Sequence, residues 1–248
     1  MASVGHSRWR ELETIRRPTR HTVYVWEWPV RIVHWVIVFA LIVLSLTGYY
    51  IHHPFLSGSG MPGHLGFTMG WMRFIDEATG FVFIAAVLGR IYWAFAGNRY
   101  ANWRALLPLT RSQRRDLSDM VRFYALMRRN PPRANGHNPL AAATYIMVYA
   151  GFVVTILTGL GLFAWLYRRA PWTTLFSWTW NVMSIPALRL LHFLLMFVYI
   201  AFVFLHVYTS IVIDIEERNG ELSSIITGYK TNILEGERPR DEPPPDEP

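Results

Sequence analysis

The chain has 248 residues, of which 52% are hydrophobic, 15% aromatic and 17% charged, whereas soluble domains carry about 25% charged residues. It contains no cysteine, which excludes disulfides, thiolate-held iron–sulfur clusters and covalent attachment of a c-type haem. The formal net charge is +7, but the arginines are segregated along the chain, so we ascribe the charge to membrane topology and expect no nucleic acid as a partner.

Four apolar stretches are long enough to cross a bilayer as helices. The first follows 29 arginine-rich residues and starts too late for a typical cleaved signal peptide, so we interpret it as a retained span. The sequence thus predicts an all-α protein, an integral membrane four-helix bundle with its membrane domain at residues 30–213. We expect the N-terminal segment, the four spans and the tail at residues 1–29, 30–51, 78–96, 140–166, 187–213 and 214–248.

Arginine and lysine mark the cytoplasmic side of a membrane protein. Six arginines precede residue 32, nine lie between residues 97 and 139, and the tail adds one lysine and three arginines. The other two connections hold one and two arginines. We therefore expect both termini and the middle loop to lie in the cytoplasm.

The middle loop contains an amphipathic stretch, residues 111–129, with apolar side chains at helical spacing. This pattern predicts a helix on the cytoplasmic membrane surface between the second and third spans. Such a helix is either a lipid-associated connector or the cover of a quinone site. The tail ends in RPRDEPPPDEP, and its proline and acidic content predicts disorder.

His192 and His206 lie fourteen residues apart in the apolar run RLLHFLLMFVYIAFVFLHVY of the fourth span. Helix geometry gives about 1400° of rotation and about 21 Å of rise, so both imidazoles leave the same face, near opposite sides of a hydrocarbon core about 30 Å thick. Ionisable side chains inside a bilayer are expensive and usually functional. The pair suits two haem irons, one above the other, or two histidines hydrogen-bonded to neighbouring helices.

His34 lies about one helical turn into the first span from its cytoplasmic end, at the depth expected for His206. A haem between these two imidazoles would be a low-spin b-type site, which suits electron transfer because no coordination position stays open. His192 lies near the outer end of its span and needs a partner of its own.

Arg73 and Arg90 bracket the second span, one at each side, and are candidates to pair with haem propionates. Arg90, Arg31 and Arg189 equally suit arginines that extend to the membrane interface. Glycines in or at the ends of the spans would let either a flat macrocycle or another helix approach the backbone. They are Gly48, Gly80, Gly89, Gly151, Gly159 and Gly161.

Five segments together resemble one family. They are WPVRIVHW (28–35), LTGYYI (46–51), RIYWAFAGNRY (90–100), GHNPL (136–140) and the fourth-span histidine pair ending in HVY (206–208). With them the chain resembles, from about Tyr24 to Lys230, the b-type cytochrome subunits of membrane-bound nickel–iron uptake hydrogenases, within the bacterial cytochrome b561-like group.

The resemblance implies one or two haem b groups and a place in the bacterial inner membrane, surrounded by lipid. It implies the small and large subunits of a nickel–iron hydrogenase as partners and quinone as the electron acceptor. The chain would anchor the hydrogenase and transfer electrons, and it would not activate hydrogen itself, because nickel needs cysteine ligands. The family's haem ligands map onto His34, His192 and His206, and no catalytic residue is expected here.

The chain departs from the family at one ligand position. Where the family reads Met-Gly-x-x-Arg-x-Ile-His, this chain reads MGWMRFID at residues 69–76, with Asp76 in place of histidine. Our hypothesis is that His52, or less favourably His53 or His64, replaces that ligand opposite His192. His52 follows His34 by eighteen residues, which is five full helical turns. The other readings are a five-coordinate outer haem, an outer site without haem, and a site where Asp76 binds water or a partner.

Two other functions are weighed. A b-type cytochrome of another oxidoreductase, such as formate dehydrogenase, keeps the chemistry and changes the partner, but RIYWAFAGNRY and GHNPL favour the hydrogenase. A haem-free membrane anchor or small transporter would not need the histidines. We expect no acidic residue inside a span, since Asp76 and Glu77 are placed at the end of the second, and this disfavours transport.

Overall fold

The computed structural model describes residues 21–55, 67–106, 139–217 and 220–233, and the single residues 115, 118, 122 and 127. The backbone divides into two compact units. The larger comprises residues 27–209, and the smaller is formed by residues from the two sides of it in the sequence.

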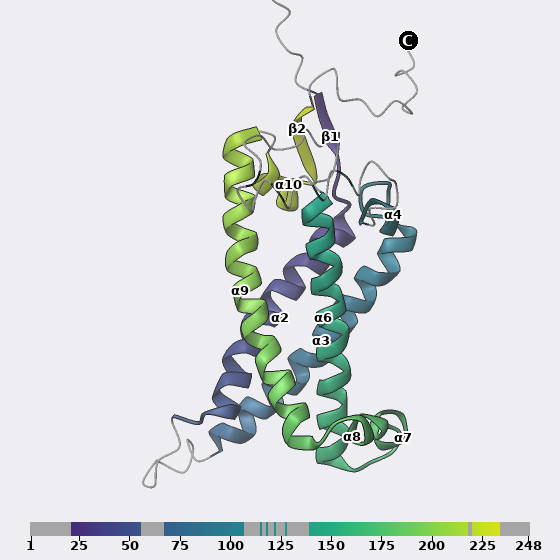
Figure 1. Cartoon of the computed structure of the whole chain (residues 1–248), viewed down its shortest axis with the longest axis vertical. Coiled ribbons are helices and arrows are strands. Elements are labelled where there is room, and N and C mark those ends of the chain that lie inside the picture. The colour runs from purple at the N-terminus through teal and green to yellow at the C-terminus, as the bar shows by residue number, and fades with distance from the viewer. Residues whose placement is uncertain are drawn as a thin grey trace, which may run out of the picture. The chain divides into compact units, whose positions relative to one another are not determined.

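The larger unit is built from four long helices, which Figure 1 shows running alongside one another. They are α2 (Trp28–His52), α3 (Thr68–Ala96), α6 (Pro139–Tyr167) and α9 (Ile185–Glu217), whose last residues belong to the smaller unit. Each is long and apolar enough to cross a membrane, which confirms the predicted fold class, an all-α bundle of four spans. The connections contain the short helices α4 (Trp103–Leu106), α7 (Trp172–Phe176) and α8 (Trp178–Val182).

The second span starts earlier than the sequence predicted. Helix α3 begins at Thr68, whereas the expected span began at residue 78. The charges at Arg73, Asp76 and Glu77 lower the hydropathy of this stretch, and hydropathy alone therefore misses it. The expectation that no span contains an interior acidic residue is wrong, because Asp76 and Glu77 both lie within the membrane-length helix.

Two other expectations stay predictions. The amphipathic stretch at residues 111–129 lies, apart from single positions, outside the described residues. The cytoplasmic location of both termini also stays a prediction.

Helices α2 and α3 pack closely against each other, whereas α9 approaches the backbones of the other long helices at few points. Small buried side chains, Ala40 on α2 and Ala86 on α3, allow the close packing. Phe83 and Phe152 meet edge to face in the same core, with ring centres 5.0 Å apart. The wider spacing around α9 leaves room for a group between the helices.

One face of α2 carries large apolar side chains that the protein does not cover. They recur every three to four residues and so form a stripe along the helix. In a membrane protein such a stripe contacts lipid, because lipid tails are as apolar as the side chains. Its most exposed members are Trp28, Ile32, Phe39, Ile42 and Leu46.

Glu27 fixes the start of α2 against the end of α3. Its carboxylate accepts a hydrogen bond from the Trp93 indole N–H at 2.8 Å and another from the Asn98 backbone N–H at 2.9 Å. Pro29 follows in the first turn of α2, where the missing N–H of proline costs no helical hydrogen bond. The resemblance segments around residues 28–35 and 90–100 thus meet in one structural joint.

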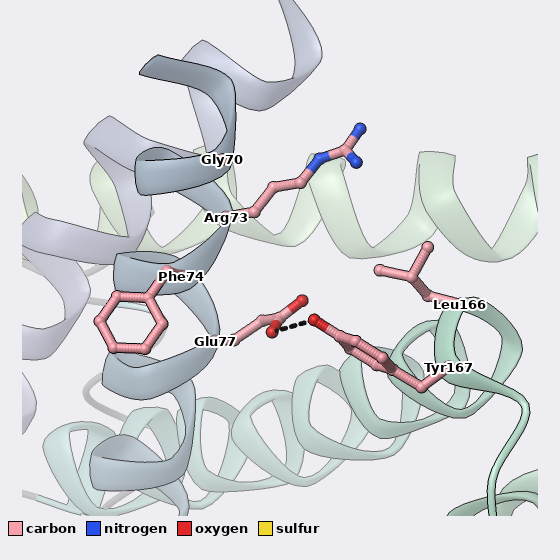
Figure 2. Close-up of a pocket in the computed structure, with 6 residues that line it drawn as sticks. All are labelled: Gly70, Arg73, Phe74, Glu77, Leu166 and Tyr167. Carbon is pink, nitrogen blue, oxygen red and sulfur yellow. Dashed lines mark hydrogen bonds between the residues drawn. The ribbon is translucent and has the colours of Figure 1, made fainter. Parts of the chain in front are cut away.

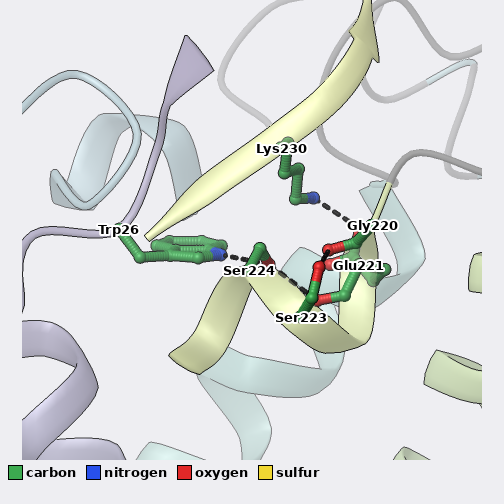
Figure 3. A network of polar contacts seen from close by, with 6 residues as sticks. All are labelled: Trp26, Gly220, Glu221, Ser223, Ser224 and Lys230. Atoms are coloured by element: carbon green, nitrogen blue, oxygen red, sulfur yellow. Dashed lines mark hydrogen bonds and ion pairs between the residues drawn. The ribbon is translucent and has the colours of Figure 1, made fainter. Parts of the chain in front are cut away.

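The smaller unit contains two antiparallel strands that the sequence did not predict, β1 (His21–Tyr24) and β2 (Tyr229–Ile233), with helix α10 (Glu221–Thr227) preceding β2. Figure 3 shows its polar network. The Trp26 indole N–H donates to the Ser224 hydroxyl at 3.2 Å, and Lys230 forms an ion pair with Glu221. These contacts join residues about 200 positions apart in the sequence, and a pattern in one short window does not reveal them.

We expect Glu27→Ala to lower the free energy of unfolding by about 1–3 kcal/mol, because two N–H donors lose their acceptor. Glu27→Gln keeps an oxygen at this position and should lose less. Thermal unfolding in detergent measures the difference. If the alanine variant unfolds at the same temperature as the wild type, Glu27 does not hold this joint.

Candidate functional site

The structure brings His34 of α2 and His206 of α9 together inside the bundle. Their ring centres lie 6.5 Å apart, with the ring planes at 54°. Two imidazole nitrogens that bind one metal at about 2 Å each place the ring centres about 6 Å apart, so the spacing fits a single metal between them. Nδ1 of His34 is buried and has no hydrogen-bond partner among the described residues.

Aromatic side chains surround this pair and fix the orientation of its rings. Phe202 stacks on His206 with ring centres 5.4 Å apart and planes at 16°. Tyr145 meets His206 edge-on at 6.1 Å, and Trp35 stands at 90° to His34 at 5.4 Å. Among the described residues no group of three or more His, Cys, Asp or Glu gathers around a metal position. Two facing imidazoles are therefore a donor set for haem iron rather than for a bare metal ion.

A second place lies between the same four helices, where they enclose a cavity of about 570 Å³. Cofactor pockets typically measure about 300–1,000 Å³ and are mostly apolar with a few polar groups. This cavity has that character, with His192, Asp76, Thr155 and Tyr199 among leucine, isoleucine and phenylalanine side chains. Gly48, Gly80 and Gly159 also line it.

His192 is held by a hydroxyl of the neighbouring helix. Its Nδ1 lies 2.8 Å from Oγ1 of Thr158, which itself donates to the backbone carbonyl of Val154 at 2.9 Å. Since the hydroxyl proton is used there, Nδ1–H of His192 donates to Thr158, and the lone pair of Nε2 stays available for a metal. Metal-binding histidines are usually held in this way through their other nitrogen.

Gly159 makes room for the imidazole of His192. A Cβ added at Gly159 would lie only 3.0 Å from Cε1 of His192. The absence of a side chain therefore lets the ring lie against the backbone of α6. The alternative reading of His192, a histidine hydrogen-bonded to a neighbouring helix, is compatible with ligation, because the hydrogen bond uses only Nδ1.

Asp76 faces the cavity from α3 and is tied to α2. The Thr47 hydroxyl donates to Oδ1 of Asp76 at 2.6 Å, and a Cβ at Gly48 would lie 3.9 Å from that same oxygen. Asp76 and His192 line the same cavity from different helices. The position at which the resemblance implies a ligand is thus next to the space where a cofactor fits.

The three substitute candidates are placed differently. His52 ends α2 and lines the cavity, with its ring stacked on Phe193 at 3.8 Å and 19°. His53 is exposed and does not line this cavity, and its ring centre lies 6.5 Å from that of Tyr49. His64 lies outside the described residues.

The candidate arginines lie at opposite parts of α3. Arg73 lines the cavity, and so does Arg189 of α9. Arg90 donates from Nη2 to the carbonyl of Ala101 at 3.2 Å, while its Nη1 is buried without a hydrogen-bond partner among the described residues. A buried cationic nitrogen of this kind calls for an anionic group nearby.

A smaller cavity of about 360 Å³ adjoins the first (Figure 2). Both are lined by Arg73, Glu77 and Leu166. The Tyr167 hydroxyl donates to Oε2 of Glu77 at 2.7 Å and so joins α6 to α3 at this place. Sequence reasoning missed Thr47, Thr158 and Tyr167, because each acts on a residue at least 29 positions away.

The model of the prokaryotic cytochrome b561 family matches residues 25–228. The chain belongs to this family. It is an integral, multi-pass protein of the bacterial inner membrane, and membership of a cytochrome b family implies haem b as the cofactor.

Relatives carry one kind of name. The chain is 35% identical over 232 residues to a probable Ni/Fe-hydrogenase B-type cytochrome subunit of Rhodobacter capsulatus, covering 92% of this chain and 88% of the relative. It is 36% identical over 217 residues to a probable Ni/Fe-hydrogenase 1 B-type cytochrome subunit of Escherichia coli, covering 84% and 91%. A relative of the same kind in Bradyrhizobium diazoefficiens is 36% identical over 215 residues, covering 85% and 87%.

We expect Thr158→Val to weaken haem binding in the larger cavity by about 10–100-fold, as is typical when a hydrogen bond to a metal-binding histidine is lost. Thr158→Ser keeps the hydroxyl and serves as the control. Haem content after purification and transfer of haem to apomyoglobin measure the effect. Equal haem retention by the valine and serine variants would show that Thr158 does not support a ligand.

Proposed function

We propose that this protein is the haem b electron-transfer and membrane-anchor subunit of a nickel–iron hydrogenase. In this function it passes electrons from the iron–sulfur small subunit to the membrane quinone pool. The facing imidazoles of His34 and His206 carry the proposal, because their spacing fits one iron. The hydrogenase partner is supported by the printed names of the relatives.

Bound haem b supplies one-electron redox chemistry at its iron. His34 and His206 would occupy both axial positions of one haem, so that no substrate reaches the metal and only electrons pass. The apolar and aromatic surroundings exclude water and influence the reduction potential. Arg90, with its buried unpaired nitrogen, is proposed to bind a propionate near this haem.

The larger cavity is proposed to hold a second haem, with Nε2 of His192 on its iron. Arg73 and Arg189 line the cavity and supply positive charge for two propionates. The cavity offers two side chains for the other axial side, His52 and Asp76. His192 and His206 lie on one helix about 21 Å apart along its axis, so the two haems would be arranged in series across the membrane.

The proposed direction follows from the expected topology. Electrons would enter from an iron–sulfur cluster at the outer face and leave to quinone near the haem of His34 and His206. Hydrogen is oxidised on the partner subunits, and quinone takes up two electrons and two protons. With both termini in the cytoplasm, the inner pair lies on the cytoplasmic side.

His34→Ala and His206→Ala should each remove one low-spin haem b from the hydrogenase complex, because a single remaining imidazole does not complete the site. Hydrogen-dependent quinone reduction should fall below about 1% of the wild type, whereas reduction of a soluble dye by hydrogen should persist. The pyridine haemochrome assay and electron paramagnetic resonance measure haem number and spin state.

His53→Ala is the matched control, since this exposed histidine does not line the larger cavity, and it should leave every reading unchanged. A well-folded wild-type complex without haem b would contradict the proposal and favour a haem-free anchor. Copurification of the chain with a formate dehydrogenase in place of a hydrogenase would contradict the partner.

A further inference from the structure

The larger cavity presents different groups on its different walls. His192 approaches from α9 and is fixed by Thr158 of α6. Asp76 approaches from α3 and is fixed by Thr47 of α2. The two side chains are therefore held by two separate pairs of helices, with the cavity between them.

His52 lies beside His192 rather than across the cavity from it. Its ring is stacked on Phe193, the residue that follows His192 on α9, with ring centres only 3.8 Å apart. A second axial ligand must approach an iron from the side opposite the first. To do so, His52 would have to give up this stacking contact, whereas Asp76 already lies on the wall formed by the other helix pair.

A carboxylate is a weak axial ligand for a haem that is already bound by one imidazole. Haem held by one histidine, as in globins and peroxidases, keeps an open position whose surroundings decide which small molecules bind. The hydrogen bond from Thr47 to Asp76 uses one carboxylate oxygen and holds the side chain against α2. Asp76 thus borders the free axial side as a polar group without closing it.

The cavity also has a route by which a small molecule can enter. It adjoins the smaller cavity at Arg73, Glu77 and Leu166 (Figure 2). The hydrogen bond between Tyr167 and Glu77 spans α6 and α3 there, and both the Tyr167 and Glu77 side chains line the smaller cavity. The smaller cavity is lined by exposed side chains of both helices, so it is reached from outside the bundle.

We infer, resting on the proposed function, that the second haem is bound by His192 alone, with Asp76 bordering an open sixth position. This haem is five-coordinate and high-spin, and it binds a small neutral ligand such as carbon monoxide. The haem of His34 and His206 stays low-spin and closed. The protein therefore combines one closed electron-transfer haem with one haem accessible to a diatomic ligand.

The test uses the purified hydrogenase complex with its native cytochrome subunit. The oxidised wild type should show one low-spin and one axial high-spin haem signal, and carbon monoxide should shift the reduced spectrum of one haem of the two. Asp76→His should convert the high-spin signal to low-spin and abolish the carbon monoxide shift, with the haem count unchanged. Asp76→Ala should keep both the high-spin signal and the shift.

His52→Ala is the matched control and should leave the spectra unchanged. Two low-spin signals in the wild type, one of which becomes high-spin in His52→Ala, would overturn the inference and assign the ligand to His52. A single low-spin haem in the wild type would overturn it too and leave the proposed function standing. A folded complex without any haem would overturn the proposed function itself.

Discussion

The arrangement of this bundle depends on imidazoles kept inside a hydrocarbon environment. A histidine in a membrane span must be satisfied by a hydrogen bond or a metal, because no water reaches it. His192 meets this condition on one side through Thr158, and its other nitrogen stays available. His34 has a buried Nδ1 without a partner among the described residues and faces His206. The loose packing of α9, which carries two of the three histidines, leaves space for what binds them.

The two cofactor places are built differently. The pair of His34 and His206 is symmetric in chemistry, with an imidazole on each side and aromatic rings around it. The larger cavity is asymmetric, with His192 on one wall and Asp76 on another. A closed site suits electron transfer, whereas an asymmetric one leaves room for a further ligand. Within one bundle, the choice of residue at position 76 separates these two behaviours.

The sequence predicted the four spans and brought His34 and His206 to one depth, because helical periodicity and hydropathy act over short windows. It misplaced the start of α3 by ten residues, since the charges at Asp76 and Glu77 hide a helix whose polar groups find partners on other helices. The contacts of Thr47, Thr158 and Glu27 join residues 29 to 71 positions apart, and no local pattern announces them. The stacking of His52 on Phe193 likewise depends on packing between helices.

The central claim is that electrons from hydrogen pass through haem on this chain. It is tested most directly by recording the haem b spectrum of membranes that contain the assembled complex while hydrogen is added under anaerobic conditions. The proposed relay predicts that hydrogen reduces haem b and that an added quinone analogue reoxidises it. Haem b that dithionite reduces but hydrogen leaves oxidised, in membranes where the hydrogenase still reduces a dye, would contradict it.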